Sequence, residues 1–173
     1  TNFSKKYSLK AACIAGVTLV KGVCKLAGLD IIKVKGATGG IDTDIEGKIE
    51  AGVKALDSYD FVLINIKAPD IYSHDGNYKG KIRIIEKIDK ACKILARLDC
   101  IKIVTCDHST PVSVMEHTSD LVPLAIAGKN APVDDVPKFD ELSCAKGAIH
   151  RIKGNALVNI ALDFAGRAEK FGA

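Results

Sequence analysis

Short apolar runs of strand length alternate with longer amphipathic segments along this chain, and this alternation constrains its fold more than any other feature. The clearest run is Tyr59–Ile66 (YDFVLINI), a nearly continuous apolar segment typical of a strand buried on both faces of a sheet. A polar loop over 67–79 and a helix over 80–98 are predicted to follow it. The apolar residues of that helix recur at helical spacing: Ile84, Ile88, Ala91 and Leu95. The alternation predicts an α/β protein with a mostly parallel sheet covered on both faces.

The remaining predicted elements continue this pattern. Strands are expected at 10–15, 30–34, 101–105 and 121–127, and helices at 17–26 and 43–56. After a loop over 130–138, the rest of the chain is predicted to be helical, with 156–165 as its last helix. The last of these strands contains Pro123, which cannot donate to a ladder, so we expect it near the edge of a sheet. The sequence has no internal repeat and no linker. We therefore predict a single domain over residues 1–173.

Composition excludes several classes of function. Of the 173 residues, 47% are hydrophobic, so we expect a folded core rather than a disordered chain. The net charge is only +4 and the lysines are spread along the chain, so no nucleic-acid partner is predicted. No apolar stretch reaches the roughly 18 residues that span a membrane, so no membrane partner is predicted. The six cysteines lie in apolar runs without a C-x-x-C pair, which is typical of a reducing cytoplasm.

An acid and a histidine follow the Tyr59–Ile66 strand, in the segment KAPDIYSHDG. Asp70 and His74 are four residues apart, so a helical turn would place both side chains on one face. A carboxylate and an imidazole so placed can share one metal ion, although a capping Asp beside an exposed His gives the same pattern. Lys67 begins the segment and is a candidate for binding a substrate phosphate or carboxylate, with a solvated lysine as the alternative.

A second group of the same chemistry follows the 101–105 strand. Asp107 and His108 are adjacent there, and His117 precedes the 121–127 strand. Turn residues at a strand end are the alternative explanation for each alone. Together, three of the four histidines lie beside strands between positions 74 and 117, and mixed carboxylate and imidazole ligands suit Mn, Zn or Co better than Ca. Two such ions can clamp the attacking and leaving oxygens of a displacement at phosphorus.

The order of these groups resembles a known family. D-x-x-x-H after one strand, D-H after the next and a later H-T before a further strand resemble the metal-binding half of the alkaline phosphatase superfamily. Within it, the chain is similar to the archaeal type of cofactor-independent phosphoglycerate mutases. The resemblance covers essentially the whole chain and rests on six stretches: Gly36–Asp44 (GATGGIDTD), Lys67–Gly76 (KAPDIYSHDG), Cys106–Val114 (CDHSTPVSV), His117–Pro123 (HTSDLVP), Phe139–Ala148 (FDELSCAKGA) and Ala165–Ala173 (AGRAEKFGA).

This resemblance implies a fold, a reaction and a set of ligands. The fold would be a three-layer α/β/α, alkaline-phosphatase-like arrangement, of which this chain forms the C-terminal half. The reaction would be the metal-dependent interconversion of 2-phosphoglycerate and 3-phosphoglycerate in glycolysis and gluconeogenesis, through a phosphoserine intermediate. Two divalent ions (Mn, Zn, Co or Mg) would serve as cofactors, with no requirement for 2,3-bisphosphoglycerate. By resemblance, one ion would be held by Asp70, His74 and His117, and Asp107 and His108 would contribute to the second.

The resemblance also implies that this chain is a fragment. The family carries its nucleophilic serine, a further metal-binding aspartate and an inserted substrate-gripping domain nearer the N-terminus, and we match none of them here. Ser73 and Ser109 lie near the proposed ligands, but neither matches the nucleophile. We therefore expect no activity from this chain alone. Its expected partners are a phosphoglycerate substrate, a missing N-terminal portion or complementary chain, and a second copy that pairs at an exposed sheet edge.

Two alternatives to a phosphoglycerate mutase stay open from the sequence. One is a related metal-dependent phosphatase or phosphomutase with a different substrate, because the residues that grip the substrate would lie in the upstream part. The other is a non-catalytic module that binds metal or merely folds.

Overall fold

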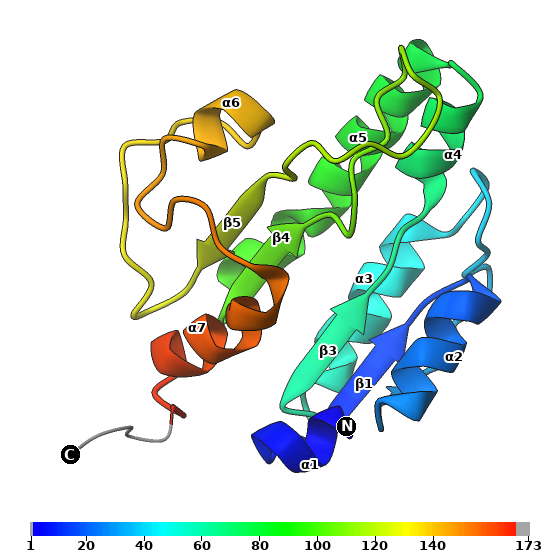
Figure 1. Ribbon diagram of the computed structural model, residues 1–173. Coiled ribbons are helices and arrows are strands. Elements are labelled where there is room, and N and C mark those ends of the chain that lie inside the picture. The colour runs from blue at the N-terminus through cyan, green and yellow to red at the C-terminus, as the bar shows by residue number, and fades with distance from the viewer. Residues whose placement is uncertain (1, 169–173) are drawn as a thin grey trace. The chain divides into compact units, whose positions relative to one another are not determined.

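The computed structural model describes residues 2–168 (Figure 1). The chain divides into two compact units, each of which is described by itself. The first comprises the residues up to Ala96 together with Thr110–Glu116, and the second comprises Arg97–Ser109 together with the residues from His117 onward. The closing stretch quoted above, Ala165–Ala173, lies partly outside the described residues, since these end at Ala168.

A parallel sheet forms the centre of the first unit. Its three strands are β1 (Ala11–Ile14), β2 (Asp30–Ile31) and β3 (Phe61–Ile64), in the order β2-β1-β3. Ala12 of β1 is in register with Asp30 of β2 and with Val62 of β3. The predicted parallel sheet is thus confirmed for the first three strands of the chain.

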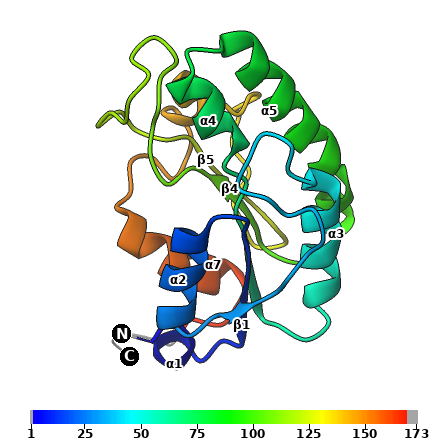
Figure 2. The same ribbon diagram turned by 90° about the vertical axis from the view of Figure 1, so that its right-hand side faces the viewer.

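Helices pack on both faces of this sheet. The helices of the first unit are α1 (Phe3–Tyr7), α2 (Thr18–Leu26), α3 (Ile45–Ala55), α4 (Ala68–His74) and α5 (Tyr78–Cys92), and a 3-10 turn, η1 (Lys93–Arg97), follows α5. Figure 2 shows α2 and α3 on opposite sides of β1. The sequence-based expectation of helices on both sides of the sheet is therefore confirmed in this unit.

Alternate side chains of the strands contribute to two apolar clusters, one on each face of the sheet. Ala11 and Cys13 of β1 face α2 and pack with its Cys24. On the other side, Ile64 of β3 packs against a cluster that α3 and α5 supply, including Ile49 and Ile84. This is the period-two alternation of a strand buried on both faces. It explains why the strands of this unit are nearly all apolar.

The helix that carries Asp70 and His74 lies where the sequence suggested a loop. Residues 68–74 form α4, which begins with Pro69 in its first turn, where the missing N–H of proline has no intrahelical acceptor to lose. Gly76, with φ of 65°, follows the helix and takes the left-handed conformation that ends it. Asn77 then caps α5 by accepting a hydrogen bond from the N–H of Gly80. The helical turn that would place Asp70 and His74 on one face is therefore present, although the sequence predicted a loop over 67–79.

The second unit pairs its strands differently from the expectation. Its strands β4 (Lys102–Thr105) and β5 (Leu124–Ala127) form an antiparallel ladder, with Thr105 opposite Leu124. The connection between them contains no crossover helix, so the chain returns antiparallel rather than parallel. The C-terminal part is also less helical than predicted. It contains α6 (Glu141–Cys144), a 3-10 turn η2 (Gly154–Ala156) and α7 (Leu157–Phe164).

Across the described part of the chain, no helix combines the length and the apolar character that crossing a membrane requires.

Candidate metal centre

Asp70 and His74 lie side by side on α4. The distance between Asp70 Oδ1 and His74 Nε2 is 3.4 Å, because residues four apart share one face of a helix. Two ligand atoms on one ion, each about 2.1 Å from it, lie about 3 to 3.4 Å apart at tetrahedral or octahedral angles. The Asp70 side chain is 15% exposed and that of His74 is 35% exposed, so both are accessible yet held in place. This pair therefore fits two ligands of a single divalent ion.

The other ring nitrogen of His74 is already committed. Nδ1 lies 2.8 Å from the main-chain carbonyl oxygen of Met115. A carbonyl oxygen only accepts, so Nδ1 donates, and in the neutral ring Nε2 then carries the lone pair. Histidines that bind metals commonly donate their second N–H to a carbonyl in this way. The nitrogen that faces Asp70 is thus the one available to an ion.

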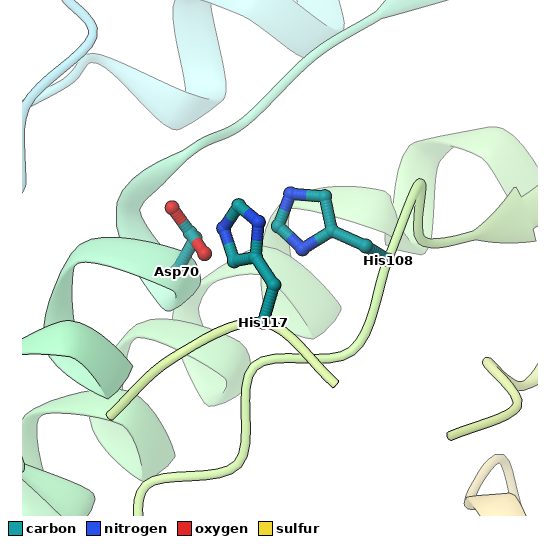
Figure 3. Close-up of side chains that lie close together, drawn as sticks. All are labelled: Asp70, His108 and His117. Atoms are coloured by element: carbon teal, nitrogen blue, oxygen red, sulfur yellow. The ribbon is translucent and has the colours of Figure 1, made fainter. Parts of the chain in front are cut away.

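Asp70 is surrounded by groups that favour its charged form. Burial opposes its ionisation, but hydrogen bonds from Lys67 and Thr110, together with the charges of Lys67 and His74, outweigh this and hold the Asp70 pKa below its ordinary value. Thr110 Oγ1 donates to Asp70 Oδ1 over 2.8 Å, and Lys67 Nζ donates to Oδ2. Figure 3 shows the carboxylate of Asp70 projecting from its helix. An ionised carboxylate is the form that binds a cation.

In the second unit, the rings of His108 and His117 lie against each other. Their centroids are 3.8 Å apart and their planes are inclined by 34° (Figure 3). An antiparallel bridge between Ser109 and Thr118 holds the two segments together, and the N–H of Thr118 donates to the carbonyl of Ser109 over 3.0 Å. The side chains on either side of that bridge point to the same face, which brings the two rings together.

The side chain of Asp107 is more exposed than those of Asp70, His74 and His108. Its side chain is 77% exposed, and its Oδ2 lies 3.6 Å from Nε2 of His108. Adjacent residues in an extended segment point to opposite sides, so they can act together only where the chain bends. The chain is bent after β4, and the two side chains turn toward each other.

Each unit thus brings its own predicted ligands together: Asp70 with His74 in the first, and Asp107 with His108 and His117 in the second. Their role as ligands stays a prediction. Sequence reasoning missed Thr110 and the carbonyl of Met115, since it took the residues after His108 as turn-forming. A sequence pattern cannot predict which main-chain carbonyl a histidine will contact. A threonine likewise gives no sign in the sequence of which distant carboxylate its hydroxyl will bind.

The chain belongs to the Metalloenzyme superfamily, whose family model matches residues 1–164. Membership in this superfamily confirms the alkaline-phosphatase-like α/β fold and the resemblance drawn from the sequence. It also agrees with a donor set of carboxylates and imidazoles.

Among curated proteins, the chain is similar to archaeal phosphoglycerate mutases. The 2,3-bisphosphoglycerate-independent phosphoglycerate mutase 1 of Methanocaldococcus jannaschii is 49% identical over 99% of this chain. The corresponding protein of Methanothermobacter thermautotrophicus is 50% identical over 99% of this chain. The chain covers only 43% and 42% of these two proteins, so it spans less than half the length of the relatives it matches.

Two solved structures share the fold. The PH0037 protein from Pyrococcus horikoshii matches all of this chain with a TM-score of 0.96 at 40% identity, and 54% of that protein is covered. The cofactor-independent phosphoglycerate mutase from Thermoplasma acidophilum matches 95% of this chain with a TM-score of 0.77 at 34% identity, and 39% of it is covered.

Proposed function

We propose that this chain is the metal-binding part of a 2,3-bisphosphoglycerate-independent phosphoglycerate mutase, which interconverts 2-phosphoglycerate and 3-phosphoglycerate through a phosphoserine. The observation that carries the proposal is the pairing of an ionised Asp70 with a His74 whose Nδ1 already donates to a carbonyl. That arrangement presents one carboxylate oxygen and one imidazole lone pair together, as a metal ligand pair requires. The mutases named above supply the reaction class.

In this proposal, Asp70, His74 and His117 hold one ion, and Asp107 and His108 contribute to a second. The order of these residues along the chain, which resembles the order of the family's ligands, supports this assignment. When bound, two ions would activate the nucleophile and neutralise charge on the transferring phosphoryl group. The mixed donor set favours Mn, Zn or Co, with Mg as a further candidate.

The chain's own residues have separable tasks. Lys67 forms an ion pair with Asp70, and its side chain is 39% exposed. It keeps Asp70 ionised, and its remaining donors are available to a substrate phosphate or carboxylate. Asp70 and His74 hold their positions through hydrogen bonds within their own unit. None of these groups is a nucleophile, so we assign the phosphorylated serine to a part of the protein, or to a partner chain, beyond these 173 residues.

The proposal extends to partners and location. A phosphoglycerate is the proposed substrate, and a cytoplasmic location follows from a glycolytic role. The three-stranded sheet ends at the short strand β2, which offers an edge for a second copy of the chain. No activity is expected from this chain without the nucleophile.

The test is a mutase assay on the longest product of the gene, after chelation and after Mn²⁺, Zn²⁺ or Co²⁺ is restored. We expect conversion of 3-phosphoglycerate to 2-phosphoglycerate only with metal, and its loss in Asp107→Ala. The control is Asp57→Ala, which removes an exposed acid in the turn after α3. Phosphate release without mutase activity would identify a related phosphatase instead. The absence of both activities in a metal-loaded protein would leave only a metal-binding module.

A further inference from the structure

The segment Thr110–Glu116, here called the strap, packs within the first unit although its chain neighbours on both sides belong to the second. Two side chains of the first unit anchor its ends. Lys81 of α5 donates through Nζ to the carbonyl of Thr110 over 3.0 Å, and His74 of α4 donates to the carbonyl of Met115 over 2.8 Å. The strap is therefore fastened to α4, which carries the Asp70 and His74 pair, and to α5, which packs against α4.

Thr110 reaches Asp70 from the first end of the strap. Thr110 is 6% exposed, and its hydroxyl donates to Oδ1 of Asp70 over 2.8 Å. Oδ1 is also the oxygen that lies 3.4 Å from His74 Nε2. The hydroxyl thus fixes the rotation of the carboxylate so that the oxygen nearest the imidazole stays there. Because the acceptor is charged, this hydrogen bond is stronger than one between neutral groups.

Met115 closes the other end of the strap in an unusual backbone conformation. Its φ is 59°, in the left-handed region that few residues other than glycine adopt. Its N–H donates to the carbonyl of Pro111 over 2.9 Å, which closes a tight turn. Backbone strain of this kind persists where surrounding contacts impose it, and it concentrates at functional sites. Here the turn aims the Met115 carbonyl at Nδ1 of His74.

We propose that the strap is a positioning element for the metal centre. Thr110 fixes the orientation of Asp70, and the Met115 carbonyl fixes the proton of His74 on Nδ1, which leaves Nε2 to bind an ion. This inference rests on the proposed function, since it assumes that Asp70 and His74 are ligands. Thr110 is a positioning residue and takes no part in the chemistry itself.

The experiment is a calorimetric titration of the longest product of the gene with Mn²⁺, in the wild type and three variants. Thr110→Val replaces the hydroxyl with a methyl group of similar volume, and we expect Mn²⁺ affinity to fall about tenfold to a hundredfold. Thr110→Ser retains the hydroxyl, and we expect the wild-type affinity. Thr43→Val is the matched control, because Thr43 is 7% exposed and donates its hydroxyl to the Thr38 carbonyl rather than to Asp70. We expect Thr43→Val to keep the wild-type affinity.

The outcomes separate this inference from the proposed function. If the wild type binds no Mn²⁺, the metal centre itself is wrong, and the strap's role is wrong with it. If the wild type binds and Thr110→Val binds equally well, or Thr43→Val loses as much affinity, only the positioning role is overturned. If Thr110→Val fails to fold, Lys81→Met tests the positioning role instead. It removes the hydrogen bond to the Thr110 carbonyl without changing the Thr110 side chain. Weaker Mn²⁺ binding in Lys81→Met supports the strap, and unchanged binding overturns it.

Discussion

Lys48 is a charged side chain on the buried face of a helix. It lies in α3 with an exposed fraction of 0%, and its Nζ donates to the carbonyls of Thr38 and Asn65 over 3.1 Å each. Burial lowers its pKa, and the nearby charge of Asp44 opposes that shift only in part. Through its two hydrogen bonds Lys48 connects the loop before α3 with the end of β3, whereas an apolar side chain at this position would only pack.

The lowered pKa of Lys48 predicts a pH dependence of stability. At neutral pH the lysine is charged in the folded and the unfolded state, and burial of that charge opposes folding. As the pH rises through the folded-state pKa toward the ordinary value of 10.5, the folded state loses the proton first, and this opposition fades. We expect wild type to gain free energy of unfolding relative to Lys48→Met over that range, as measured by urea denaturation. Lys54→Met, which removes an exposed lysine of the same helix, should show no such trend.

The burial of Lys48 could have been predicted from the sequence, whereas the strap contacts could not. Ile45, Lys48, Ile49 and Gly52 have the i, i+3, i+4, i+7 spacing of a buried helix face, and this places the lysine inside. The spacing of Asp70 and His74 likewise predicted their shared face. The contact of Thr110 with Asp70 joins residues 40 apart in the sequence. Such a contact depends on the tertiary path of the chain, which residue spacing does not encode.

At the scale of elements, the packing of α4 on α5 determines where Asp70 and His74 are held. Gly80 of α5 faces the ring of Tyr72 in α4, and a Cβ added to Gly80 would come within 2.4 Å of that ring. Gly22 of α2 offers a contrast, because a Cβ there would meet nothing within 4 Å. The available space therefore requires glycine at position 80 but would admit a side chain at position 22.

This contrast gives a prediction with its own control. Gly80→Ala should destabilise the chain by about 1 to 3 kcal/mol, because the methyl group overpacks the contact between the two helices. Gly22→Ala should stabilise it by about 0.5 to 1 kcal/mol, because alanine restricts the unfolded chain in an exposed helix. Thermal or urea unfolding of both variants measures the difference. Equal effects of the same sign would contradict the tight packing of α4 on α5.

The sequence predicts most elements of the first unit and fewer of the second. The strong apolar runs of β1 and β3 locate these two strands to within two residues at each end. The periodicity of α5 locates its start, but the α-helix ends at Cys92 and continues as the 3-10 turn η1, whereas the prediction extended to residue 98. Three features escape prediction. The short helices α1 and α4 contain too few residues for a periodic pattern, and the partner of β4 is chosen by the path of the chain after Asp107. Irregular segments after β5 carry no periodic signal.

At the scale of the whole molecule, an apolar face of α2 remains exposed. Leu19, Val23 and Leu26 recur at i, i+4 and i+7, and their exposed fractions are 74%, 59% and 87%. This helix packs beside β2, the outer strand of the sheet. An apolar helix face beside a strand edge is a surface on which a second copy can pack.

We therefore expect this chain to self-associate at micromolar concentrations, and sedimentation velocity measures it. Leu26→Lys should shift the population toward monomer, because a charge in the contact disfavours burial. Leu142→Lys is the control, since Leu142 is 82% exposed on α6 of the second unit and lies outside this face. A wild-type chain that sediments only as a monomer would contradict the prediction, as would equal effects of the two variants.

The central claim of a divalent metal centre is tested most directly by titrating the longest product of the gene with Co²⁺ and recording its visible absorption, which reports ligand type and geometry. We expect a saturable spectrum of cobalt with imidazole and carboxylate ligands, and its weakening in His74→Ala and in His117→Ala. His150→Asn is the control, because it removes the fourth histidine and retains a residue that tolerates its φ of 53°. A chain that shows no cobalt spectrum, or one whose spectrum depends on His150 as much as on His74 and His117, would contradict the account.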